Sequence, residues 1–205
     1  MALKYLETST TTAVRAAQEH YYGAGRALPP APERDVLTPD EIAFVEARDS
    51  FYLATVTEDG WPYIQHRGGP AGFLKVLGPN QLGFADLGGN RQLLSTGNLA
   101  AHEKVALFLM DYPRRERLKL LGRARVLDAR DQPALADQLA PSLALRAAVE
   151  RLFVIDVTGF DWNCPKYITP RYTAAEVERV VAPLKARIAA LESELKAIST
   201  QRHGL

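Results

Sequence analysis

Cysteine is nearly absent from this sequence: Cys164 is the single one among 205 residues. No disulfide can therefore form within the chain, which fits a reducing compartment, and we expect a cytoplasmic protein. Long apolar runs are also missing, since none approaches the roughly 20 residues of a membrane helix. Residues 1–12 are polar and rich in Thr, unlike the apolar core of a signal peptide. We expect no membrane partner.

An excess of one charge sign is missing as well. The formal net charge is +1, whereas a nucleic-acid binder usually carries a strongly basic surface, so we expect no nucleic-acid partner. The four His residues lack metal-ligand spacing, which argues against a metal site. No Gly-x-Ser-x-Gly sequence is present, so the serine of a hydrolase elbow is excluded.

Short strands joined by turns dominate the middle of the chain. Residues 50–57 and 61–67 are rich in β-branched and aromatic side chains and flank an Asp59-Gly60 turn, which is typical of a hairpin. About six such strands lie between residues 50 and 157, and helices do not follow each of them, as parallel winding would require. The pattern predicts a mainly β fold, a small closed or partly closed barrel.

Helices are expected around this barrel rather than inside it. Residues 10–22 form an amphipathic pattern, and residues 23–37 read as a Pro-rich linker. Thr38-Pro39-Asp40-Glu41 is a capping-box helix start. Further helices are predicted over residues 90–103 and 132–151. We divide the chain into an N-terminal helix and linker (residues 1–37), the barrel (38–172) and a C-terminal helix (173–205).

The first candidate site follows the second strand, in the sequence His66-Arg67-Gly68-Gly69-Pro70. A guanidinium group matches phosphate oxygens in pairs, and the glycines let a ligand approach the backbone closely. The alternative is a strand end with a solvated arginine.

The second candidate begins at Ala85-Asp86 and continues through Gly88-Gly89 to Asn90, Arg91 and Gln92. If Asn90 caps a helix, free N–H groups and the helix dipole favour an anion there, and Arg91 adds a full charge. The alternative is an ordinary strand-to-helix turn. Because both candidates end strands that we expect to be neighbours, together they predict a phosphate site.

These segments resemble the flavin-binding split barrels of the pyridoxamine 5′-phosphate oxidase family. The resemblance rests on SFYLATVTEDGWPYIQHRGGP, LGFADLGGNRQLLSTGNLAAHEKVALFLMDY and RLKLLGRARVL. It implies a six-stranded split β-barrel with peripheral helices, a homodimer, and flavin mononucleotide (FMN) bound between the two subunits. It also implies that Arg67 and Arg91 bind the FMN phosphate.

The same resemblance implies further cofactor contacts. Trp162, followed nine residues later by Arg171, matches a C-terminal pair that contacts FMN in the family, although Trp162 could equally be a core aromatic. Gln65 and His66 would lie at the isoalloxazine edge. The full set of expected cofactor-binding residues is Gln65, His66, Arg67, Gly68, Ala85, Asp86, Asn90, Arg91, Gln92, Trp162 and Arg171.

One departure from the family concerns the substrate. The oxidases carry an Arg-x-His element before their final Arg, where this chain has Tyr167 and Thr169. We therefore do not expect pyridoxamine phosphate as the small-molecule substrate. Three hypotheses remain: an FMN-dependent oxidoreductase, a flavin-binding protein without turnover, and a split-barrel protein that uses haem or a deazaflavin. No residue is singled out as a catalytic acid or base.

The last segment has a pattern of its own. From Val177 to Ile198, apolar residues are spaced alternately by four and three, as in a heptad repeat, with Pro183 inside it. This helix is expected to pack either on its own barrel or against a partner subunit.

Overall fold

The structure, a computed structural model, describes residues 2–23, 27–89, 91–162 and 166–202. The chain forms two compact units. One holds residues 1–111 and 116–166, and the other holds residues 112–115 and 167–205. Cys164 lies outside the described residues. No helix in the described part of the chain is both long and apolar enough to cross a membrane.

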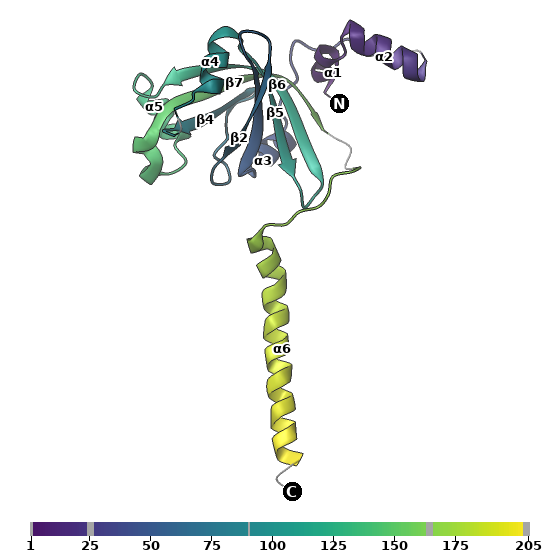
Figure 1. Ribbon diagram of the computed structural model, residues 1–205, viewed down its shortest axis with the longest axis vertical. Coiled ribbons are helices and arrows are strands. Elements are labelled where there is room, and N and C mark those ends of the chain that lie inside the picture. The colour runs from purple at the N-terminus through teal and green to yellow at the C-terminus, as the bar shows by residue number, and fades with distance from the viewer. Residues whose placement is uncertain (1, 24–26, 90, 163–165, 203–205) are drawn as a thin grey trace. The chain divides into compact units, whose positions relative to one another are not determined.

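A single antiparallel sheet of seven strands makes up most of the first unit (Figure 1). Its strands are β1 (Ser50–Val56), β2 (Pro62–Gly68), β3 (Lys75–Gly78), β4 (Gln81–Leu87), β5 (Lys104–Asp111), β6 (Glu116–Asp128) and β7 (Val149–Trp162). They lie in the order β2-β1-β5-β6-β7-β4-β3, so the sheet does not close and β2 and β3 are its edges. The mainly β prediction is confirmed, with seven strands in place of six.

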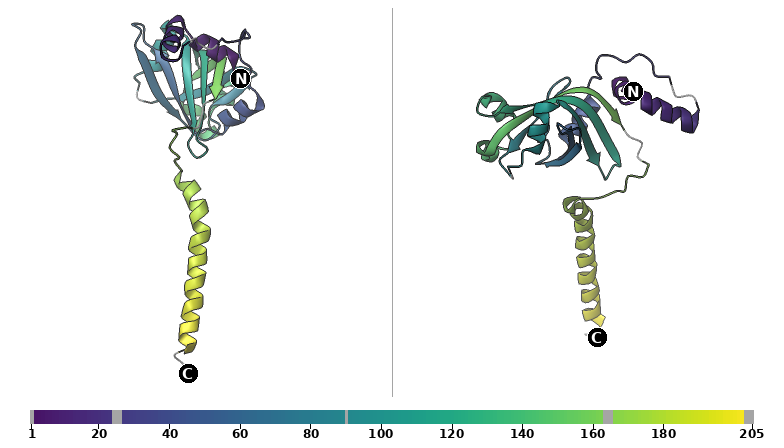
Figure 2. Two further views of the ribbon diagram at one scale, coloured as in Figure 1. Left: turned by 90° about the vertical axis from the view of Figure 1, so that its right-hand side faces the viewer. Right: turned by 45° about the horizontal axis from the view of Figure 1, so that its top comes forward.

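The hairpins lie where the turn residues predict them. Gly60, with a φ of +87°, closes the turn between β1 and β2, where only glycine adopts the left-handed backbone without strain. The sheet twists and curves around its inner face (Figure 2). That face carries the main core, which includes the stacked rings of Phe84 and Phe153, 4.7 Å apart.

The strand β7 is longer than predicted. The expected helix over residues 132–151 is wrong in its second half: α5 (Pro133–Leu139) and a 3₁₀ turn, η1 (Leu143–Ala148), end before β7 begins at Val149. β7 pairs with β4 on one side and β6 on the other. Two full ladders of backbone hydrogen bonds outweigh the weak helical preference of the residues around 149–151.

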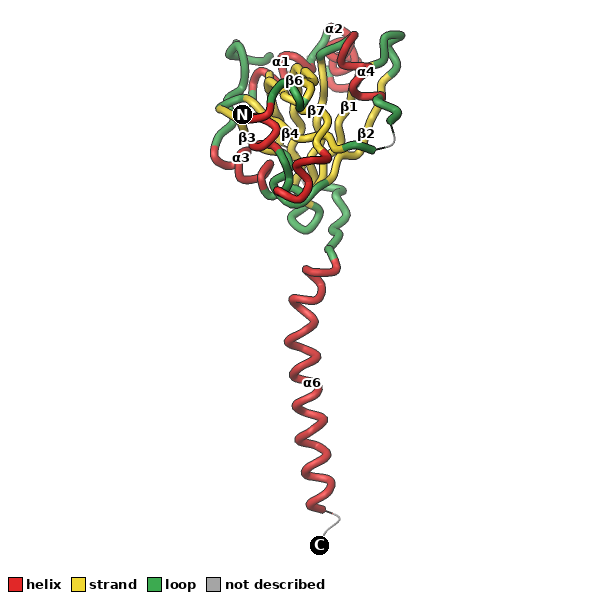
Figure 3. The backbone as a smooth tube through the Cα atoms, turned by 90° about the vertical axis from the view of Figure 1, so that its left-hand side faces the viewer, coloured by secondary structure: helices red, strands yellow, loops and turns green. Residues whose placement is uncertain are grey.

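Five helices belong to the described part of this unit (red in Figure 3), and all except α2, which buries none of its residues, pack against strands. They are α1 (Leu3–Ser9), α2 (Thr12–Tyr22), α3 (Pro39–Glu46) and α4 (Leu94–Ala101), besides α5. The capping box at the start of α3 is confirmed: the Thr38 backbone N–H donates to Glu41 at 2.8 Å. The second unit contains α6 (Ala174–Arg202).

The predicted linker is partly ordered by one buried carboxylate. Asp35 accepts hydrogen bonds from the backbone N–H groups of Lys4, Tyr5 and Phe160 at 2.9, 3.0 and 3.3 Å. Its side chain therefore caps the start of α1 and ties that helix to β7. Leu37, two residues later, enters the core.

We expect Asp35→Asn to lower the free energy of unfolding by about 2 kcal/mol or more, because buried N–H donors then lose a charged acceptor. Urea denaturation at neutral pH measures this. Glu33→Gln is the matched control: Glu33 lies in the same segment with its side chain 90% exposed, so its loss should stay within about 0.5 kcal/mol. Equal effects of the two substitutions would contradict the anchoring role of Asp35.

Candidate functional site

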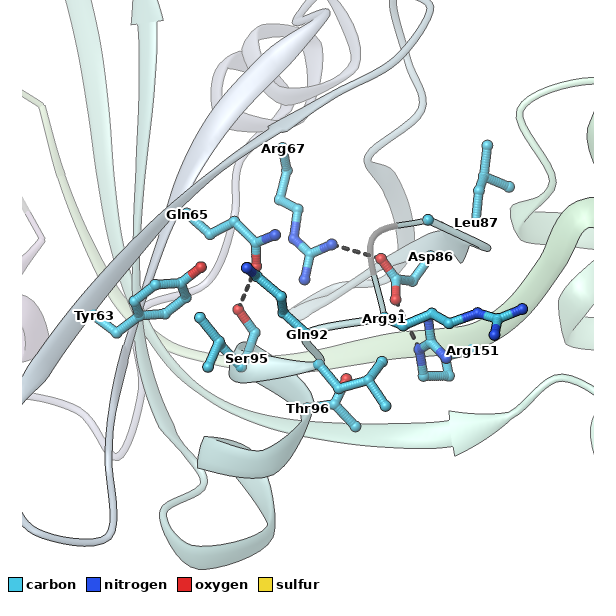
Figure 4. A pocket seen from close by; sticks show the side chains of 13 residues that line it. Tyr63, Gln65, Arg67, Asp86, Leu87, Arg91, Gln92, Ser95, Thr96 and Arg151 are labelled. Atoms are coloured by element: carbon cyan, nitrogen blue, oxygen red, sulfur yellow. Dashed lines mark hydrogen bonds and ion pairs between the residues drawn. The ribbon is translucent and has the colours of Figure 1, made fainter.

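A cavity of about 250 Å³ lies at the inner face of the sheet, beside the edge strand β2 (Figure 4). Its walls come from four segments that are distant in sequence: β2, the end of β4 with the loop after it, the start of α4, and the start of β7. The lining residues are Tyr63, Gln65, Arg67, Asp86, Leu87, Gly89, Arg91, Gln92, Leu93, Leu94, Ser95, Thr96 and Arg151.

Strand alternation decides which β2 residues reach this cavity. Gln65 and Arg67 lie opposite Leu53 and Phe51 of β1, which are both buried in the core, so these polar side chains share the inner face. His66 falls on the other face, where its ring packs edge-on against that of Tyr52, with the ring centroids 5.6 Å apart. Like His66, Gly68 is exposed and does not line the cavity, although both were expected beside Arg67.

Arg67 is held in an aromatic and acidic environment. Its guanidinium carbon lies 5.4 Å and 5.0 Å from the ring centroids of Phe84 and Phe153, a favourable cation–π arrangement. One terminal nitrogen is 2.5 Å from a carboxylate oxygen of Asp86. The Nε atom of Arg67 is buried and has no hydrogen-bond partner within the described residues, an orphaned donor of the kind that a bound anion would satisfy.

Asp86 bridges two arginines. Its second oxygen lies 2.8 Å from Nε of Arg151, which also pairs with Glu150 at 2.8 Å. Burial lowers the pKa of Arg151, but the hydrogen bond and charge of Asp86, with a contribution from Glu150, raise it above its ordinary value. Arg151 therefore remains charged at the cavity wall.

The sheet register explains why these groups meet. Phe84 pairs with Phe153 across β4 and β7, and Asp86 pairs with Arg151 two residues further on, so both pairs share one face. A register shift follows directly, where Leu87 pairs with Val149 and Glu150 is left as the extra residue. Such a bulge bends the strand and ends the regular ladder at the cavity.

The loop after β4 has an uncommon backbone. Arg91 and Leu93 have φ values of +59° and +53°, a left-handed conformation that non-glycine residues rarely adopt and that clusters at ligand sites. Arg91 and Gln92 line the cavity as expected, but the Arg91 side chain is exposed and points away from Arg67 (Figure 4). Asn90 lies outside the described residues.

The start of α4 differs from the prediction. The helix begins at Leu94, four residues after Asn90, and its N-cap is Leu93, whose side chain accepts no hydrogen bond. An uncapped helix start at the cavity wall presents backbone N–H groups and the positive end of the dipole. Ser95 donates a hydrogen bond to Gln65 at 2.7 Å, and Asn98 donates one to Thr55 at 2.9 Å, which hold α4 against β1 and β2.

Three other expected contacts lie elsewhere. Ala85 is buried in a small second core cluster and does not reach the cavity. Trp162 lines a separate cavity of about 690 Å³, where its ring packs edge-on against Phe44 at 4.8 Å. Arg171 belongs to the second unit, where its guanidinium lies 4.9 Å from the ring centroid of Tyr112.

Sequence reasoning missed Arg151 and Ser95. Arg151 was assigned to the end of a helix, whereas it stands two residues before Phe153 on the inner face of β7. Arg151 and the buried Phe153 are two residues apart, which is the spacing of neighbouring side chains on one face of a strand. This spacing could have indicated a strand.

The charges around the cavity favour an anion. Three arginines and one carboxylate line it. Two of these arginines, Arg67 and Arg151, are mostly buried, which strengthens their field compared with bulk water. No group of three or more His, Cys, Asp or Glu side chains capable of holding a metal occurs among the residues that the structure covers. The arrangement is suited to binding a phosphate group through arginine and backbone N–H donors.

Comparison with known proteins identifies one matching family. A family model described as pyridoxamine 5′-phosphate oxidase matches residues 37–155, which contain all seven strands except the end of β7. No curated protein matches the sequence.

Solved structures with a similar fold are distant in sequence. A substituted form of HupZ from Group A Streptococcus is 12% identical, with a TM-score of 0.50, over 62% of this chain and 98% of that one. An FMN-binding protein from Syntrophomonas wolfei is 11% identical, with a TM-score of 0.45, over 60% and 86%. HutZ, a haem storage protein from Vibrio cholerae, is 16% identical, with a TM-score of 0.45, over 60% and 92%.

The position of Trp162 generates a stability prediction. Its indole N–H donates to Glu41 at 2.5 Å. Burial raises the pKa of Glu41, but hydrogen bonds from the Thr38 hydroxyl, the Trp162 indole and backbone N–H groups together lower it below 4.5. We expect Trp162→Phe to cost about 1.5–3 kcal/mol of unfolding free energy at neutral pH, because it removes a hydrogen bond to a charged group.

The pH dependence of this loss has a definite sign. A carboxyl with a lowered folded pKa stabilises the fold above its unfolded pKa, and the contribution disappears as the pH falls through the folded value. The difference between wild type and Trp162→Phe in denaturant unfolding should therefore shrink well below pH 4.5. Trp61→Phe is the control, since Trp61 is 74% exposed and should change stability little. A pH-independent loss would contradict the Glu41 interaction.

Proposed function

Because this chain belongs to the pyridoxamine 5′-phosphate oxidase family, we propose that its cavity binds the phosphate of FMN and that the protein is an FMN-dependent oxidoreductase acting on a small molecule. The observation that carries this proposal is the Arg67 side chain, fixed on two aromatic rings by Asp86 and keeping a buried Nε without a partner among the described residues.

The residues of the cavity fit an anionic cofactor. Arg67 and Arg151 are immobilised by their shared carboxylate, so little side-chain entropy is lost when a phosphate binds. Arg91 stands on a loop whose left-handed residues bring its backbone to the cavity wall. The start of α4, which has no side-chain cap, adds the positive end of its dipole to these charges.

In this proposal the protein binds and orients FMN and the substrate, while the cofactor carries the redox chemistry. Bound FMN would supply hydride transfer between a substrate and its ring nitrogen N5. Both oxygens of Asp86 are engaged by arginines, so this carboxylate holds the phosphate site together and is not placed to accept a substrate proton. Gln65, fixed by Ser95, presents a polar group next to Arg67.

The visible spectrum of the purified protein separates FMN from haem, which the similar fold of HutZ makes a relevant alternative. Bleaching of the flavin bands by a reduced nicotinamide, followed by recovery in air, would favour turnover over storage. A haem spectrum in a protein that does not take up FMN would overturn the proposal.

We further propose that the protein is a homodimer in which FMN lies between two barrels. The outer face of β1, β2 and β5 supports this, since Tyr52 pairs with Phe108 on it, and Ile64, which pairs with Ala54 on the same face, is 65% exposed. Exposed apolar and aromatic side chains with polar ones among them, here His66 opposite Tyr52 and Lys119 opposite Phe108, are typical of a protein interface. This outer face lies on the other side of the same edge strand, β2, whose inner face lines the cavity.

We expect Arg67→Ala and Arg91→Ala each to weaken FMN binding at least tenfold, about 1.4 kcal/mol. Arg67 would lose a charge-assisted contact to the phosphate, and the exposed Arg91 side chain, which must turn toward the phosphate to reach it, would lose the same kind of contact. Fluorescence titration of the apo-protein with FMN measures this.

Arg130→Ala is the matched control, because Arg130 is 88% exposed, pairs with Asp128 and does not line the cavity. It should bind FMN like the wild type. Unchanged affinity in both site variants, with folded protein by circular dichroism, would exclude the phosphate assignment.

The sheet-face interface has its own test. Ile64→Glu places a charge on the outer face of β2, which should weaken barrel association and lower FMN affinity several-fold, because the cofactor would lose contacts from the second subunit. Leu143→Glu, at a position that is 96% exposed in η1, is the control. It should change neither the association of the barrels nor the affinity for FMN. Wild-type FMN affinity in Ile64→Glu would contradict a cofactor shared across this face.

A further inference from the structure

The helix α6 carries a row of apolar side chains that stay in contact with solvent. It is 29 residues long, and none of its side chains that the structure describes is buried; Leu184 and Leu195 are 59% and 66% exposed. Helices of globular proteins owe most of their stability to packing of such a face. The row consists of Val177, Val181, Leu184, Ile188, Leu191, Leu195 and Ile198.

The width of this row distinguishes between the surfaces that could cover it. Its members alternate in steps of four and three, which fills the a and d positions of three heptads, with Ile188 at a and Leu184 and Leu191 at d. A helix that packs on a globular core usually shows a wider face, with a third apolar position in each heptad. A narrow a/d row is the seam of a coiled coil. Pro183 falls at a c position, away from the seam.

The charges on α6 flank this seam. Five of the seven charged residues between 177 and 201 occupy e or g positions, the positions that select a partner in coiled coils. Glu178, Lys185 and Glu192 are at e, and Arg187 and Glu194 are at g. A helix that packed on its own barrel would not need charges of both signs along both edges of its apolar face.

We propose that α6 docks on α6 of a second copy of this chain, as an antiparallel two-stranded coiled coil. With Ile188 opposite Leu191 of the second copy, Lys185 faces Glu192 and Arg187 faces Glu194. Two-fold symmetry repeats both pairs, which gives four attractive contacts and no like-charge contact at the edges.

The alternative orientation is less complementary. A parallel pair in register brings together only Arg187 and Glu192, twice, and leaves Lys185 beside Val180 and Glu194 beside Ser199. The antiparallel register also overlaps the two helices over residues 177–202, nearly the whole of α6. The proposal is independent of the cavity and of its cofactor.

Distances between spin labels on the full-length protein test the proposal. With Cys164→Ser as background, one label is attached through Ala190→Cys and, in a second protein, through Arg179→Cys; both positions are exposed and lie off the seam. In the antiparallel pair, residue 190 lies opposite residue 189, whereas residue 179 lies opposite residue 200. The distance between the two labels should be short at 190 and about 30 Å longer along the axis at 179.

Other occupants of the seam give other distances. Equal, short distances at both positions would mean a parallel pair and would overturn the antiparallel arrangement. Long, broad distances at both, as expected if α6 packs on its own barrel or on an unrelated partner, would overturn the proposal.

Matched variants keep the test independent of a general loss of folding. In the protein labelled at residue 190, Ile188→Glu should abolish the short distance between the two labels. Ala186→Glu, at an exposed f position, should leave that distance unchanged. Arg187→Glu should lengthen the distance, and a further Glu194→Arg should restore it. Restoration by Glu192→Arg in place of Glu194→Arg would contradict the antiparallel pairing.

Discussion

The Asp86 carboxylate, shared between Arg67 and Arg151, organises the inner end of this sheet. Each oxygen binds one guanidinium group, and the stacked pair Phe84–Phe153 lies beneath Arg67. Two like charges in a partly buried site would repel each other strongly without the carboxylate between them. The network therefore gathers positive charge at one wall of the cavity while keeping the strands β2, β4 and β7 in fixed positions.

Much of this arrangement could be predicted from sequence, and the limits have physical causes. The β1–β2 hairpin and the capping box of α3 depend on local chemistry, Asp59-Gly60 and Thr38 with Glu41, so local reasoning found them. Arg67 was recognised for the same reason, since it ends a strand before two glycines. Arg151 could not be recognised in this way, because its place in β7 depends on pairing with β4, about 65 residues away.

Other differences come from alternation and from context. His66 and Gly68 were grouped with Arg67 because they are adjacent in sequence, yet neighbouring strand residues face opposite sides of a sheet. Trp162 was weighed between cofactor contact and core aromatic, and in this structure its indole binds Glu41 at the start of α3. The helix α4 begins later than Asn90 suggests, because left-handed residues at Arg91 and Leu93 delay the turn.

The length of β7 constrains how such a protein can change. Its 14 residues carry Arg151 near one end and Trp162 at the other, so one continuous strand connects the charged cavity with the attachment of α3. A single-residue insertion or deletion between them would flip every following side chain to the opposite face unless a bulge absorbed it, as the register shift at Thr158 already does once in this strand. Changes in length are therefore tolerated more easily in the loops around this sheet than along β7, where an added or lost residue must be absorbed by a bulge to keep Arg151 and Trp162 in place.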